Sequence, residues 1–264
     1  MMKLNRTKAV LLGLVAATAA TPLLANHSWN DYHWLRTAQE VTPSVGDNVD
    51  SNWDSYLRDA NADWNQSTVI NSPLVAGTTN PKNCKAVPGT IQVCNSRYGQ
   101  TGWLGIASIW LSGGHISQGT TKLNDTYFNS AKYNTPDWRA LVTCQEVGHD
   151  YGLGHQDEDF NTDNTNSCMD YTNFPAGNTT PDSHDYAELL SIYDHFDSAS
   201  ATVFGRGASN AGAESGDSPA DWGRAVHFDR QGRPDYFMMD LGNGQKKVTH
   251  VFWALGESPR RMRD

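Results

Sequence analysis

Residues 145 to 155 read Gln-Glu-Val-Gly-His-Asp-Tyr-Gly-Leu-Gly-His, and the interpretation of the whole chain depends on this stretch. In a helix, Gln145 and His149 lie one turn apart on the same face. Gly152 can adopt the left-handed conformation that residues with a Cβ resist, so it can end the helix and turn the chain back. We therefore expect His155 to return toward His149, with Glu146 beside them.

Start signals for this helix stand ten residues upstream. Asn134 or Thr135 can cap the helix, Pro136 suits the first helical position, and Asp137 favours the positive end of the helix dipole. The pattern predicts a helix that begins near residue 135 and ends at Gly152.

A second element follows at Ser167-Cys168-Met169-Asp170-Tyr171. Together with the spacing of Glu146, His149, Gly152 and His155, it resembles the metzincin zinc peptidases, in which a helix with the pattern H-E-x-x-H-x-x-G-x-x-H is followed by a tight turn carrying a Met. The secreted bacterial and matrixin-like members look most similar. The resemblance covers residues 134 to 171, and it departs from the family at Gln145, where the pattern has its first His.

The resemblance implies a site that holds Zn²⁺ and activates water. His149 and His155 would be metal ligands by direct match, and Gln145 by position only. Glu146 would be the general base, and Met169 would lie beneath the metal. Tyr171 would bind the metal or steady the tetrahedral oxyanion, with an ordinary packed aromatic residue as the alternative.

The four cysteines fall into two local pairs, and disulfides are the default in an exported chain. Cys84 and Cys94 flank the strand-like Thr90-Ile-Gln-Val93, which suggests a small disulfide-closed hairpin. Cys144 directly precedes the first ligand position and Cys168 directly precedes the Met, so a bridge between them would tie the metal helix to the Met turn. Thiolate ligation by Cys144 is the rival, but this residue points about 100° off the ligand face.

The N-terminus and the charge set limits on location and partners. Residues 1 to 25 combine three cations with an Ala-rich apolar run, as in a secretory signal, with a membrane anchor as the alternative. The net charge of −9, more negative still once the signal is removed, argues against nucleic acid and anionic membrane as partners. We expect a secreted protein, monomeric, acting on protein or peptide.

The fold class expected is α+β. A metzincin-like catalytic domain over residues 26 to 198 would contain a twisted mixed sheet, a helix over 51–64, the metal helix, the Met turn and a closing helix over 181–196. Strands are expected near residues 32–36, 67–70, 103–111 and 115–123. The strand at 103–111 is either an edge strand that pairs with an extended peptide or a plain interior strand.

The C-terminal part changes character. Residues 199 to 220 are rich in Ala, Gly, Ser and Asp and are interpreted as a linker. Residues 221 to 264 would form a small β-rich appendage with strands at 224–229, 235–240 and 247–254. This segment is too small to hold a core alone, so it would dock on the catalytic domain or on a partner.

Several other polar residues are weaker candidates. The run from Asp157 to Asp163 could bind Ca²⁺, although its spacing matches no known calcium loop and a solvated loop explains it as well. His115, His184 and His195 are interpreted as surface or core residues rather than ligands.

Two functions follow. The first is a secreted zinc-dependent endopeptidase that hydrolyses peptide bonds with metal-activated water and Glu146 as base. The second is a catalytically weak or inactive secreted binding protein of the same fold. Gln145 separates them, because a lost ligand suggests loss of activity, whereas a retained general base suggests that catalysis persists.

Overall fold

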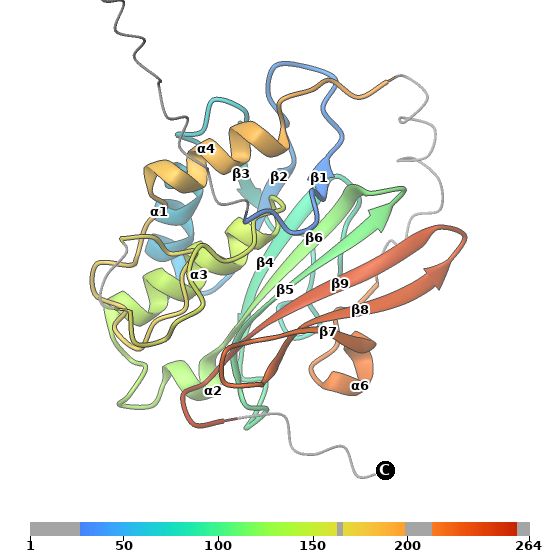
Figure 1. Cartoon of the computed structure of the whole chain (residues 1–264). Coiled ribbons are helices and arrows are strands. Elements are labelled where there is room, and N and C mark those ends of the chain that lie inside the picture. The colour runs from blue at the N-terminus through green and yellow to red at the C-terminus, as the bar shows by residue number, and fades with distance from the viewer. Residues whose placement is uncertain (1–26, 163–165, 199–212, 258–264) are drawn as a thin grey trace, which may run out of the picture.

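The computed structural model describes residues 27–162, 166–198 and 213–257, and within these ranges nine strands form one mixed sheet (Figure 1). The strands are β1 (His33–Trp34), β2 (Ser44–Asn48), β3 (Leu74–Ala76), β4 (Thr90–Ser96), β5 (Trp103–Ser112), β6 (His115–Asn124), β7 (Arg224–Phe228), β8 (Pro234–Gly242) and β9 (Gln245–Trp253).

The sheet has a parallel half and an antiparallel half. The strand order is β3-β2-β4-β6-β5-β9-β8-β7, and β1 pairs with the beginning of β6. Strands β1 to β4 and β6 are parallel to one another, whereas β5 is antiparallel to both β6 and β9. The C-terminal strands β7 to β9 therefore extend the sheet that the N-terminal strands form.

The longer helices cover one face of this sheet, as Figure 1 shows. They are α1 (Asp54–Trp64), α3 (Pro136–His149) and α4 (Ser183–Ile192), with the short α2 (Asp125–Phe128) at the end of β6. Between helices and sheet lies the main core, which includes Trp53, Leu57, Trp64, Leu141 and Val147. None of the helices in the described ranges has both the length and the apolarity needed to cross a bilayer.

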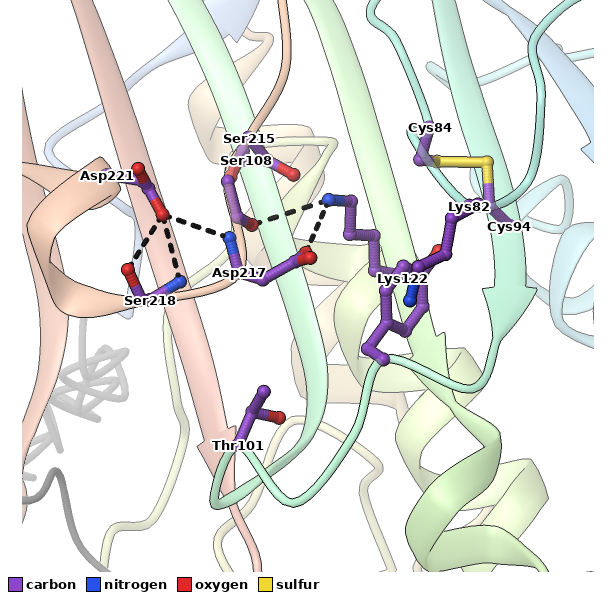
Figure 2. A network of polar contacts seen from close by, with 12 residues as sticks. Lys82, Cys84, Cys94, Thr101, Ser108, Lys122, Ser215, Asp217, Ser218 and Asp221 are labelled. Atoms are coloured by element: carbon purple, nitrogen blue, oxygen red, sulfur yellow. Dashed lines mark hydrogen bonds and ion pairs between the residues drawn. A yellow bond between two sulfur atoms is a disulfide. The ribbon is translucent and has the colours of Figure 1, made fainter.

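The opposite face of the sheet carries the short helix α6 (Pro219–Trp222). Trp222 packs there in a second apolar cluster with Trp103, Phe237 and Trp253. Buried lysines bind the segment before α6. Lys122 Nζ, for example, lies 2.8 Å from Asp217 Oδ1 (Figure 2).

Most of the expected elements are present. The expected helices over 51–64 and 181–196 are α1 and α4, and the three C-terminal strands are β7, β8 and β9. The C-terminal segment docks on the sheet of the preceding part of the chain, because β9 pairs along β5. Strand β5 is consequently an interior strand, and the alternative of a free edge is wrong.

Two local expectations are also wrong. Residues 67–70 form turns and one isolated bridge rather than a strand, and the short strand β3 follows at Leu74–Ala76. The segment before Cys94 is not a hairpin, because β4 pairs in parallel with β2 and β6. The expected signal at residues 1–25 and most of the expected linker, residues 199–212, lie outside the described residues.

Both expected disulfides are present. Cys84 is bonded to Cys94 and Cys144 to Cys168, and no described cysteine is free. The second bridge joins α3 to the turn that carries Met169, at a sequence separation of 24. Thiolate ligation by Cys144 is thereby excluded in the oxidised protein.

Replacing Cys144 and Cys168 together with Ala is expected to lower the free energy of unfolding by about 3 kcal/mol, because a loop of this length restricts the unfolded chain by that amount. Denaturant titration of the metal-free protein measures the change. The paired replacement of Cys84 and Cys94, which closes a shorter loop, is the matched comparison and should cost less. An equal or larger cost for the shorter loop would contradict the loop-length account.

Candidate metal centre

Helix α3 carries the first site residues into the interior. The Thr135 hydroxyl accepts a hydrogen bond from the Trp138 amide and Pro136 occupies the first turn, as the start signals predicted. The side chains of Glu146 and His149, near the end of the helix, are fully buried.

The turn after α3 depends on Gly152. Its φ is 97°, and a Cβ at this position would lie 1.9 Å from the backbone oxygen of Tyr32. Only glycine fits both the conformation and the close approach. The chain then reverses and the rings of His149 and His155 lie 4.8 Å apart, so the expected convergence of these two residues is confirmed.

The turn with Met169 lies directly against α3. A Cβ at Gly148 would lie 2.5 Å from Met169 Sδ, so the missing side chain at Gly148 makes room for the buried Met. Gln145 Nε2 donates to the carbonyl oxygens of Cys168 (2.7 Å) and Asp170 (2.9 Å). The amide group of Gln145 thus holds this turn in place.

Gln145 as a metal ligand stays a prediction. Its Oε1 is buried and has no hydrogen-bond partner among the described residues, so that oxygen is not committed elsewhere. Its Nε2, however, is held by two backbone carbonyls, and this restricts where Oε1 can move.

A third histidine, which the sequence analysis missed, completes the cluster. His250 on β9 is fully buried, and its ring lies 4.0 Å from that of His149 and 4.8 Å from that of His155. Each of the three imidazoles offers a nitrogen within 4.8 Å of the other two. The hairpin of β8 and β9 therefore does more than dock on the sheet, because it contributes a side chain to the cluster.

A signal for His250 exists in the sequence. Side chains alternate between the two faces of a strand, so Val248, His250 and Phe252 share a face. Val248 and Phe252 belong to the main core, against α3. A histidine between two core residues of a strand is a buried polar group that needs a partner.

The ring nitrogens of His149 and His155 are arranged as metal ligands require. Nδ1 of His149 lies 2.8 Å from the oxygen of Leu153, and Nδ1 of His155 lies 3.0 Å from the hydroxyl of Tyr236. The Nε2 atoms of both residues are buried and have no hydrogen-bond partner in the described structure. Buried polar atoms are seldom left unpaired, and a divalent metal would satisfy both at once.

Burial also sets the protonation of the cluster. Desolvation lowers the pKa of His149 and of His155 well below the usual range, and that of His250 to about 3. The imidazoles are therefore neutral, which is the form that binds a metal.

Glu146 sits beside the three histidines. Its Oε2 lies 3.1 Å from His250 Nδ1, and its Oε1 is buried without a hydrogen-bond partner in the described structure. Desolvation raises the pKa of this carboxyl well above its usual range.

The ring of Tyr171 packs against an aromatic neighbour, and its hydroxyl makes polar contacts. Its ring stacks on Phe160, and its hydroxyl donates to Asp235 and lies 3.1 Å from His250 Nε2. The other carboxylate oxygen of Asp235, Oδ1, lies within hydrogen-bond distance of His227 Nδ1, at 2.8 Å. Tyr171 therefore lies next to the cluster, where the sequence analysis expected it.

A cavity of about 610 Å³ opens next to the cluster. The lining includes Trp29, His155 and Tyr236, together with Arg224 to His227 of β7. Because Glu146, His149 and His250 do not line it, the cavity reaches the cluster through His155.

The acidic loop after His155 meets a cation from the C-terminal part. Arg230 lies 3.1 Å from an oxygen of Asp159 and 3.8 Å from one of Asp157. The described residues of this loop form no ligand cluster, and calcium binding there stays a prediction.

Replacing Asp185 with Asn is expected to change how stability varies with pH. Asp185 is fully buried beneath the Met turn, and desolvation raises its pKa from 3.8 to about 7. The folded protein thus keeps this proton up to pH 7, whereas the unfolded chain releases it near pH 4. The contribution of Asp185 to the free energy of unfolding therefore falls as pH rises from about 4 to 7.

The Asn variant cannot ionise and should lack this part of the fall. Denaturant titrations of the metal-free protein at pH 5 and pH 7.5 measure the difference, with the exposed Asp59→Asn as the control. Parallel pH dependence of wild type and Asp185→Asn would contradict the expectation.

No protein-family model matches this chain, and no curated protein matches it either. The case for a function therefore rests on the geometry of the site and on the sequence pattern.

Proposed function

We propose that the protein is a secreted, metzincin-like endopeptidase that depends on zinc, held by His149, His155 and His250. The observation that carries the proposal is the pair of buried, unpaired Nε2 atoms of His149 and His155 in a cluster of three imidazoles, the third of which contacts Glu146. Three neutral imidazoles from two distant parts of the chain are the donor set of a catalytic zinc site, which keeps one position open.

The metal, when bound, supplies Lewis acidity and makes a water molecule easier to deprotonate. The residues of the chain do the rest. Glu146 takes the proton of the attacking water and passes it to the leaving amine. Tyr171, two residues after Met169, has its hydroxyl next to the cluster, and this hydroxyl would have to release Asp235 before it could donate to a developing oxyanion.

Peptide substrates would approach through the cavity rather than along β5. The edge of β5 is fully paired with β9, so no added strand can bind there. In contrast, β7 is the last strand of the sheet among the described residues, and it lines the cavity together with His155. An extended peptide in the cavity could therefore pair with β7.

The proposal is tested by measuring metal content and digestion of casein by the purified protein. We expect about one zinc in the His149 cluster, proteolysis that stops with a chelator, and recovery on adding zinc back. Secretion is supported by the two disulfides and by the signal-like residues 1–25, and export of a tagged full-length chain would check it.

A second candidate is a binding protein that holds the metal without catalysis. The contact between Glu146 and His250 Nδ1 favours it, because a carboxylate that orients a ligand histidine is a common outer partner of a metal. Glu146 would then stabilise the site instead of acting as a base. Full metal content without proteolysis would support this candidate over the peptidase.

A further inference from the structure

A second cluster of metal-binding side chains lies apart from the first, with no residue in common. Ligand atoms of His33, His115 and Asp197 all lie within 4.8 Å of one another. These residues come from β1, from the start of β6 and from the segment after α4. We propose that this cluster is a structural binding site for a transition-metal ion, with zinc the best fit.

Strand register brings the two histidines together. β1 pairs in parallel with β6, and His33 is the direct partner of His115. Their rings lie 4.9 Å apart. Side chains of directly paired residues lie on the same face of a sheet, so both imidazoles project toward the same point.

Asp197 is fixed opposite them by the backbone of Arg36. The Asp197 amide donates to the oxygen of Arg36 at 2.8 Å, and Asp197 Oδ2 accepts from the Arg36 amide at 2.6 Å. Its other oxygen, Oδ1, lies 2.9 Å from Nε2 of His115 and 3.5 Å from Nε2 of His33. The carboxylate thus has one oxygen held by the backbone and one turned toward the histidines.

The hydrogen bond of His33 fixes the tautomer that a metal needs. Nδ1 of His33 lies 2.7 Å from the carbonyl oxygen of Asp31, which can only accept, so Nδ1 carries the hydrogen and Nε2 the lone pair. That Nε2 is buried and has no hydrogen-bond partner in the described structure. An unpaired buried nitrogen next to a carboxylate and a second imidazole is the observation that points to a ligand. Nε2 of His115 instead lies 2.9 Å from the carboxylate of Asp197, which can only accept, so His115 would release that hydrogen on binding a metal.

His195 supplies a fourth group. Its Nε2 lies 3.6 Å from Asp197 Oδ1, and its Nδ1 lies 3.2 Å from the carboxylate of Asp194, which can orient the ring. Three imidazoles and one carboxylate would supply four donors, the number that a structural zinc site uses. Nitrogen donors also disfavour Ca²⁺, which takes oxygen ligands.

The site would join three segments that are distant in sequence. Metal binding would join β1 and the segment just after α4 to the beginning of β6. This inference does not depend on the first metal site or on catalysis, because it rests on different residues.

Zinc titration of the full chain tests the proposal. The wild type should bind two zinc ions. His33→Gln and His115→Gln should each weaken one of them by at least about 100-fold, since loss of even an outer partner of a metal costs about 10- to 100-fold. A variant with both His149 and His155 replaced by Ala should still bind one zinc, and His115→Gln in that background should remove it.

His184→Gln is the matched control, because His184 is a histidine of α4 that belongs to neither cluster. His195→Gln is a variant that cannot disturb the core, since its side chain is half exposed, and it should also weaken the second zinc. Zinc should raise the melting temperature of the His149/His155 double variant, whereas Ca²⁺ should not.

The proposal is overturned if the wild type binds a single zinc that is lost with His149 and His155. It is overturned equally if His33→Gln, His115→Gln and His195→Gln all bind two zinc ions as tightly as the wild type. Circular dichroism of each variant without metal checks that the fold is intact.

Discussion

Replacing Glu146 with Gln is expected to lower peptide hydrolysis by about 100- to 10,000-fold, the usual contribution of a general acid or base, while zinc content stays near normal. Gln keeps the size of the side chain and can still contact His250, so the packing around α3 should survive. It cannot take up a proton, and that step is the role assigned to Glu146. Steady-state rates on a peptide substrate, with zinc measured on the same samples, give both quantities.

The same variant distinguishes the two proposed functions. If Glu146 only orients His250, Glu146→Gln should weaken zinc binding by about 10- to 100-fold, as loss of an outer partner does. Activity at saturating zinc would then change little. Glu40→Gln, at a half-buried carboxylate that accepts from Asn71, serves as the control for a carboxyl lost away from the site. Hydrolysis within a few-fold of wild type at full zinc occupancy would refute Glu146 as the base.

Replacing His250 with Ala is expected to weaken zinc binding in the first cluster by at least about 100-fold and to abolish activity, because only two imidazoles would remain. Gln145→Ala should behave differently. It removes two hydrogen bonds to the Met turn and leaves the carbonyls of Cys168 and Asp170 without these donors. A loss of about 1–3 kcal/mol of stability is expected, with zinc binding largely retained.

Comparing the zinc affinities of Gln145→Ala and His250→Ala shows which residue is the third metal ligand, besides His149 and His155. If Gln145→Ala weakens zinc binding as strongly as His250→Ala does, Gln145 coordinates the metal, as its position in the sequence pattern predicts. If only His250→Ala does so, Gln145 is a positioning residue for the Met turn. His184→Ala controls for the loss of a histidine outside the clusters.

The sequence predicted the local parts of the site and failed on the distant one. The helix with Glu146 and His149, the glycine turn and the approach of His155 are all set within eleven residues, where helical periodicity and backbone sterics decide the geometry. Both disulfides were predicted correctly for a similar reason, because each joins neighbouring segments.

His250 could not be placed from local patterns. Its position depends on β9 pairing with β5, in the register that sets His250 opposite Ala107. Strand periodicity predicts that His250 is buried, but it does not tell which strand lies next to β9. For the same reason the sequence analysis left open whether β5 was an edge strand and did not bring His33, His115 and Asp197 together.

The long-range origin of His250 has a consequence for the order of events in folding. Glu146 and His250 are 104 residues apart, and His250 reaches the site only when β9 pairs with β5. Pairings across such separations form late. Under the proposed function, an incompletely folded chain would hold zinc weakly and cut nothing, so the capacity to hydrolyse peptides would arise only with the finished fold.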